Sequence, residues 1–307
     1  MVNQGYATCL SYKTIYTMRL NGRRESSNVD DRRGSGGGGR LARIGGGGIG
    51  AIIIAGLIAW LTGGNPLDVI TQSGALSPAT TQETAYTPTP EEENLATFSK
   101  QILAGTEDVW TEQFAKMGLT YRPPKLVLFN GSVNSGCGYA SSQTGPFYCS
   151  ADQSVYIDLS FFSNMRRDLG ADGDFAYAYV IAHEVGHHVQ YLLGTLDKAH
   201  TRMSQVSEKE SNRLSVRLEL QADYYAGVWA YHDNRMFNSL EEGDIEEAVN
   251  AAQKIGDDYL QRKAQGYTVP DAFNHGTSEQ RVRWLTKGLS TGDVAGGDTF
   301  SPRYERL

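Results

Sequence analysis

Cysteine and basic side chains are both scarce in this chain of 307 residues. Its three cysteines, Cys9, Cys137 and Cys149, leave little material for a structural zinc site, which four Cys or His ligands usually close. From Asp68 onward, 20 Lys and Arg face 32 Asp and Glu. A domain with this negative balance repels nucleic acid, so we expect no nucleic-acid partner.

Low complexity is confined to the N-terminal part of the chain. Residues 34–50 are too rich in glycine to pack. The run from Ile44 to Leu67 carries no charge and has an apolar centre at Ile49–Leu61. Because this run is long enough to cross a bilayer, we expect a transmembrane helix at residues 44–67. A buried core helix and a cleaved signal peptide are the alternatives.

Charge sets the expected orientation of that helix. Up to Leu67, eight Lys and Arg face three Asp and Glu. The positive-inside rule then places residues 1–43 in the cytoplasm as a basic, glycine-rich leader. Residues 68–90 follow as a Ser/Thr/Pro-rich linker, residues 91–290 as an extracytoplasmic domain and residues 291–307 as a flexible tail. The chain is therefore expected to be a single-pass protein of the plasma membrane.

A His-Glu-x-x-His motif, His183 to His187, follows the apolar run FAYAYVIA at residues 175–182. Four residues apart on a helix, His183 and His187 lie on one face, so both imidazoles can reach one cation. Glu184 lies one step round the helix, where it can polarise a water on that cation. The alternative is a surface helix, but buried imidazoles and a buried carboxylate need partners, which a metal supplies. The motif predicts a zinc hydrolase.

A catalytic zinc needs three protein ligands and one open position, and the segment Arg217–Gly227 offers the third ligand. Glu219 and Asp223 are four residues apart on a second expected helix, at about residues 207–230. Glu219 would bind the metal, and Asp223 would accept a hydrogen bond from the other ring nitrogen of His183. Two solvated carboxylates on a helix surface are the alternative.

These stretches resemble the zincin metallopeptidases whose third ligand is a glutamate. More closely, the chain resembles a bacterial family of membrane-anchored, neutral zinc metallopeptidases. The matching segments are Arg23–Gly34, AHEVGHHVQ, LELQADYYAGVWA and His275–Arg281, and together they span about residues 18 to 290. The resemblance implies a zinc peptidase of the cell envelope and no particular substrate. Because it begins at Met18, we expect residues 1–17 to precede the true start of translation.

His275 and Arg281 flank the start of a last expected helix, which a capping box from Thr277 to Gln280 opens. A similar His and Arg element follows the zinc site in membrane-bound zinc endopeptidases that process prenylated or misfolded membrane proteins. The analogy implies that His275 or Arg281 stabilises the oxyanion on the substrate carbonyl. A structural histidine and an arginine in a surface ion pair are the alternatives.

Other elements are expected from local composition. We expect a helix at about residues 92–117, strands at Lys125–Asn130 and Ser154–Leu159, and a helical segment at Glu241–Lys263. The second strand is expected at the edge of a sheet, where an extended peptide could pair with it. Cys137 and Cys149 flank a short, turn-rich stretch. In an oxidising compartment they would form a disulfide, and two buried free thiols are the alternative.

We therefore expect an α+β, zincin-like domain, mainly helical with a small sheet, behind an N-terminal transmembrane helix. Zn²⁺ bound by His183, His187 and Glu219, with Glu184 as general base, would hydrolyse peptide bonds in a peptide or protein substrate. Two other functions remain open. One is a zinc-containing envelope protein that binds peptides or partners without catalysis. The other is a zinc amidase that acts on a non-protein substrate.

Overall fold

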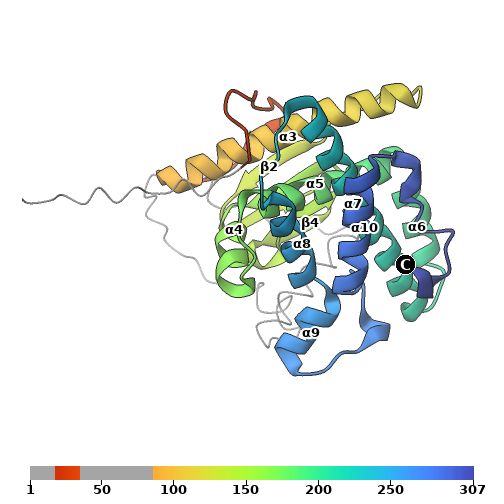
Figure 1. The fold of residues 1–307 in the computed structure, drawn as a ribbon. Helices are drawn as coiled ribbons and strands as arrows, with labels where there is room; N and C mark the ends of the chain where they lie inside the picture. Colours follow the sequence, from red (N-terminus) through yellow and green to blue (C-terminus); the bar gives the residue numbers. More distant parts are fainter. Residues whose placement is uncertain (1–17, 35–85) are drawn as a thin grey trace, which may run out of the picture.

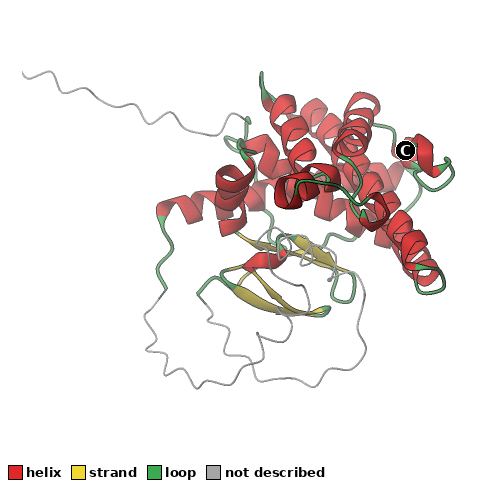
Figure 2. Ribbon diagram, turned by 90° about the horizontal axis from the view of Figure 1, so that it is seen from below, coloured by secondary structure: helices red, strands yellow, loops and turns green. Residues whose placement is uncertain are grey.

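The computed structural model describes residues 18–34 and 86–307, which form a body of helices packed on a small sheet (Figure 1, Figure 2). The helices in these ranges are α3 (Pro90–Lys116), α4 (Ser160–Asn164), α5 (Asp174–Leu192), α6 (Thr195–Met203), α7 (Glu208–Phe237), α8 (Asp244–Lys254), α9 (Asp257–Gln265) and α10 (Ser278–Thr291). Short helical turns are η2 (Ser142–Thr144), η3 (Met165–Leu169), η4 (Pro270–Ala272), η5 (Val294–Gly297) and η6 (Tyr304–Arg306). The mainly helical α+β class expected from the sequence is confirmed.

The main sheet has the order β1-β2-β6-β5, built from β1 (Val29–Asp31), β2 (Lys125–Phe129), β6 (Ser154–Asp158) and β5 (Phe147–Cys149). The β1, β2 and β6 strands run parallel, and β5 runs antiparallel to β6. A separate hairpin joins β3 (Ser132–Ser135) to β4 (Gly138–Ser141). The strand expected at the edge, β6, is wholly buried between its neighbours, so that expectation is wrong. The edge strand beside it is β5, whose three residues are too few to show a periodic pattern.

The chain from Met18 to Gly34 belongs to the folded body, although the sequence suggested a separate leader. Its strand β1 pairs with β2, with Val29 opposite Leu126. The Arg23 guanidinium donates two hydrogen bonds to the Asp233 carboxylate, at 2.7 and 3.2 Å. Met18 is buried in the core. These contacts explain the position of this arginine-rich segment, because its charges meet acidic partners on the helices.

The predicted transmembrane segment, residues 44–67, lies outside the described residues, as do residues 1–17 and most of the linker. In the parts of the chain that are described, no helix has the length and apolar character needed to cross a membrane.

Two helical predictions change in detail. The segment expected as one helix, Glu241–Lys263, divides into α8 and α9 at Gly256. A Cβ added at Gly256 would lie 2.3 Å from the Ser278 nitrogen, so this glycine permits a close approach to the start of α10. The capping box predicted there is confirmed: Thr277 and Gln280 bond to each other's backbone nitrogens.

The tail after Ser290 packs against the body, where the sequence suggested a flexible segment. The Arg217 guanidinium on α7 donates to the carbonyl oxygens of Thr299 and Pro302. Leu307 is buried, and its carbonyl accepts a hydrogen bond from Arg283 on α10. The tail therefore covers the outer side of α7 and α10, the two helices behind the candidate site.

Candidate metal centre

The His-Glu-x-x-His motif lies in the middle of α5, which is buried along most of its length. Gly186 lets α5 approach α7 closely, because a Cβ added there would lie 2.9 Å from the Ala222 carbonyl oxygen. A larger residue would push the two helices apart. The close contact brings Glu219 on α7 opposite His183 and His187 on α5.

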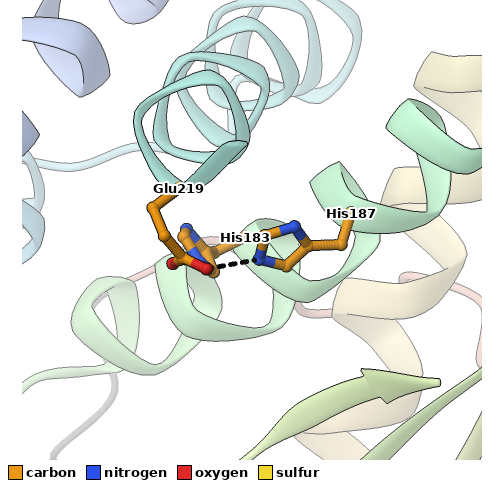
Figure 3. A group of neighbouring side chains, drawn as sticks. All are labelled: His183, His187 and Glu219. Carbon is orange, nitrogen blue, oxygen red and sulfur yellow. Dashed lines mark hydrogen bonds and ion pairs between the residues drawn. The ribbon is translucent and has the colours of Figure 1, made fainter. Parts of the chain in front are cut away.

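The predicted ligands His183, His187 and Glu219 come together in one cluster (Figure 3). His183 Nε2 lies 3.1 Å from Glu219 Oε2, and His187 Nε2 lies 3.5 Å from Glu219 Oε1. One ligand atom from each side chain lies within 4.8 Å of the other two. Two imidazoles and one carboxylate are a common donor set for a catalytic zinc, so the residues fit this metal.

The electrostatics of the cluster also favour a cation. Burial alone would lower the pKa of His183, but the charges of Asp223 and Glu219 raise it to about 10. Burial would raise the pKa of Glu219, yet His187 first, and then His183 and His275, hold it well below its usual range. The carboxylates thus stabilise positive charge between the imidazoles. A divalent cation can supply that charge in place of protons.

Asp223 fixes the orientation of His183, the role that the sequence suggested for it. The carboxylate is fully buried, and burial alone would raise its pKa. Arg281 and His183 outweigh burial and lower the pKa to about 2, so Asp223 is ionised. His183 Nδ1 must therefore donate the hydrogen bond of 2.8 Å to Asp223 Oδ1. This bond leaves Nε2 facing Glu219. The Tyr179 hydroxyl donates to the same carboxylate oxygen at 2.6 Å.

Arg281 contacts Asp223, whereas His275 contacts Asp257 and also influences the charge of Glu219. Arg281 is 3 % exposed, and its Nε and Nη2 donate to the two Asp223 carboxylate oxygens at 2.9 Å each. The His275 ring is also buried, and its Nδ1 lies 3.2 Å from Asp257 Oδ1. The structure thus separates two residues that the sequence treated as equivalent candidates.

Glu184 is 3 % exposed and lies close enough to His183 and His187 to feel their charges. Burial raises the pKa of its carboxyl, and the two imidazoles act in the opposite direction. A carboxylate with a raised pKa is a better proton acceptor near neutral pH than an exposed one. This environment suits a general base.

Two glutamines that the sequence reasoning missed hold His187. His187 Nδ1 donates to Gln190 Oε1 at 2.9 Å. Gln190 Nε2 in turn donates to the Leu218 carbonyl and, at 3.2 Å, to Gln221 Oε1. Gln221 Nε2 donates to the Gly297 carbonyl at 2.7 Å. The three-residue spacing from His187 to Gln190 could have indicated the contact between these two side chains, because such residues lie on one face of a helix. No spacing in the sequence near His187 indicates the role of Gln221.

His188, the residue after His187 on α5, is fully buried. Its Nε2 donates to the Arg122 carbonyl at 2.6 Å, and its Nδ1 accepts from the Tyr148 hydroxyl at 2.9 Å. Burial lowers the pKa of His188 to about 4, so the ring is neutral. It anchors α5 to β5 and plays no part in the metal cluster.

The predicted disulfide is present in the structure and joins Cys137 to Cys149. Cys137 lies in the turn of the β3–β4 hairpin, and Cys149 ends β5. The bond therefore ties the edge strand of the main sheet, which packs beside α5, to the separate hairpin.

Comparison with known proteins agrees with this geometry. Residues 18–300 match the family model described as "Putative neutral zinc metallopeptidase". The chain is 50% identical over 289 residues to "Uncharacterized protein YpfJ" of Escherichia coli K12, which covers 92% of this chain and 99% of the relative. It is 44% identical over 191 residues to "Uncharacterized protein Rv2575" of Mycobacterium tuberculosis H37Rv, which covers 59% of this chain and 64% of the relative. No solved structure gives a significant match. The chain belongs to the family that this model describes as "Putative neutral zinc metallopeptidase".

Proposed function

We propose that this protein is a zinc-dependent peptidase whose metal is held by His183, His187 and Glu219. The observation that carries the proposal is the buried cluster of these three side chains, with their ligand atoms within 4.8 Å of one another. Asp223 and Gln190 support it, because each bonds the Nδ1 of one histidine and leaves the Nε2 for the metal.

When bound, zinc would supply Lewis acidity and lower the pKa of a coordinated water. The protein would supply the proton transfers. Glu184, with its carboxyl pKa raised by burial, takes a proton from the attacking water and passes it to the leaving amine.

Two buried residues complete the proposed roles. His275 keeps its Nε2 available because Nδ1 faces Asp257, so we assign to it the hydrogen bond to the developing oxyanion. Arg281 acts through Asp223, which it contacts, and so holds His183 in place. Arg281 is therefore a positioning residue in this proposal.

An extended polypeptide is the substrate that the sheet fits best. Peptides often bind by adding a strand to the open edge of a sheet. In the described part of the chain, β5 ends the main sheet and packs beside α5, which carries the zinc motif. A substrate paired with β5 would lie beside α5, and its backbone would make most of the contacts.

The test uses the full chain, because β1 lies outside the expected domain at residues 91–290 yet belongs to its sheet. Zinc content and cleavage of an unstructured protein are measured for the wild type, Glu184→Gln and Glu219→Ala. Glu246→Gln, the same change as at Glu184 but on the exposed surface of α8, is the matched control. We expect one zinc per wild-type chain, loss of cleavage with retained zinc in Glu184→Gln, and weaker zinc binding in Glu219→Ala.

Two outcomes would contradict the proposal. Full cleavage by Glu184→Gln would exclude the general-base mechanism. Zinc binding without cleavage by the wild type would favour a peptide-binding envelope protein, or an amidase with a non-protein substrate. Assays on cell-wall amides would then separate those two.

A further inference from the structure

A cavity of about 800 Å³ lies apart from the metal cluster, between the C-terminal end of α3, the α6 and α7 helices, and the η5 turn. Its lining does not include His183, Glu184, His187 or Glu219. Cavities of about 300–1,000 Å³ hold small organic ligands. The size alone therefore permits a ligand, and the lining decides which kind.

Most of the cavity wall is apolar. The contributing side chains come from four elements or their connecting loops and include Met117, Leu193, Leu214, Val294 and Phe300. An apolar chain placed there would be removed from water, and each buried methylene group would strengthen binding.

Basic side chains at the cavity are available, and the acidic ones are already engaged. Lys198 and Arg202 lie four residues apart on α6, are exposed and line the cavity. Asp293 accepts a hydrogen bond from the Ala295 nitrogen. Asp298 accepts bonds from the backbone nitrogens of Phe300 and Ser301. The Ser301 side chain first, and then these backbone bonds, lower the pKa of Asp298. Counting Lys116, the lining carries three basic side chains against these two carboxylates, and this excess of one positive charge favours an anion.

A buried amide at the cavity makes no hydrogen bond to any described residue. Gln113 lines the cavity and is 6 % exposed, and its Nε2 is unpartnered. A buried donor without an acceptor destabilises the folded state, and a ligand that supplies an acceptor removes that cost. Lys116, three residues further along α3, also lines the cavity and forms a surface ion pair with Glu112. Residues spaced by three lie on one face of a helix, so one acceptor group could bond to both Gln113 and Lys116.

We propose that this cavity binds an amphipathic anion, a long-chain carboxylate. Its head accepts hydrogen bonds from Gln113 and Lys116, its chain lies on the apolar wall, and the basic side chains of α6 add attraction. This function is separate from peptide hydrolysis and does not depend on it.

The cavity also touches the hydrogen-bond chain that holds His187. Gln221 and Gly297 line the cavity and bond to each other. Gln221 bonds to Gln190, which bonds to His187. A ligand that shifts Gln221 therefore acts on a proposed zinc ligand through two side chains. We expect occupancy of the cavity to change the rate at which zinc leaves the protein.

Binding is tested by calorimetric titration of the full chain with dodecanoate, below its micelle concentration. Gln113→Leu removes the donor and keeps a similar shape, and we expect dodecanoate to bind about tenfold more weakly, as for loss of one bond to a charged group. The same variant should unfold at an equal or higher urea concentration than the wild type, because the lost donor is unpartnered. This pair of results separates a ligand role from a structural one.

Charge and space are tested by further variants and probes. The double variant Lys198→Glu/Arg202→Glu should weaken dodecanoate binding, while Arg262→Glu, an exposed position on α9, should not. Leu214→Trp should narrow the apolar part of the cavity and weaken dodecanoate binding without changing the circular dichroism spectrum. Equal binding of dodecyltrimethylammonium would overturn the anionic assignment. Absence of dodecanoate binding by the folded wild type would overturn the proposal itself.

Discussion

The Asp223–Arg281 ion pair behind His183 is open to a quantitative test. Both side chains are buried, with Asp223 at 0% and Arg281 at 3% exposure. Replacing Asp223 with Asn keeps the shape of the side chain but removes its charge. The Arg281 guanidinium would then remain in the core without an ionised partner. The amide nitrogen of the new side chain would also face an N–H group of Arg281 or His183, and two donors cannot bond to each other.

Two effects of Asp223→Asn can be calculated from this geometry. Breaking a buried ion pair by removal of one partner costs about 3–5 kcal/mol of folding free energy. His183 would also lose the carboxylate that accepts its Nδ1 hydrogen at 2.8 Å. Loss of such a partner weakens metal binding by about 10–100-fold. Stability and zinc affinity should therefore fall together.

Urea unfolding followed by tryptophan fluorescence measures the first effect, and competition with a zinc chelator measures the second. Glu279→Gln breaks an exposed ion pair with Arg283 and should cost no more than about 1 kcal/mol. The double variant Asp223→Asn/Arg281→Met leaves neither charge buried, so its loss of stability should be smaller than the sum of the two single losses. Additive losses, or wild-type stability of Asp223→Asn, would refute the buried pair.

Three further predictions test other contacts. Burial, together with Asp174 and other acidic neighbours, raises the pKa of Glu247 to about 7. The folded state therefore binds this proton more tightly than the unfolded state does. The free energy of unfolding should fall as pH rises from about 4.5 to about 7. Glu247→Gln should flatten that part of the urea-unfolding pH profile. Gln190→Leu should weaken zinc binding about tenfold, because His187 loses its hydrogen-bond partner, and competition with a chelator measures this change. The free energy of unfolding should change less than the free energy of zinc binding. Gly227→Ala should lower the unfolding midpoint, with a cost of about 1–3 kcal/mol, because the added Cβ would lie 2.2 Å from a backbone oxygen of α10.

The helices of the site were predictable because their spacing is local. His183 and His187, and again Glu219 and Asp223, are four residues apart, and one helical turn places each pair on one face. The sequence could not show that Gly186 permits α5 and α7 to approach closely, since this depends on Ala222, a residue far along the chain.

Sheet order and long-range partners lay beyond sequence reasoning for a similar reason. The short strands β1 and β5 have three residues each, and such strands carry almost no periodic signal. Gln221 and Arg281 lie on expected helices, but their roles follow from which helices pack together. Arg281 could only be assigned to Asp223 once α10 was seen beside α7.

Pairing of β1 with β2 constrains how this protein can meet a membrane. Strands that share backbone hydrogen bonds must lie in one aqueous compartment, so residues 29–31 and the metal cluster face the same solvent. Gly34 and Tyr86 also lie together, because a Cβ added at Gly34 would come within 2.5 Å of the Tyr86 ring. The last residue described before the gap and the first residue described after it are therefore neighbours. Residues 18–34 and the domain at residues 86–307 therefore share one compartment, and the expected end of the leader at residue 43 does not separate them.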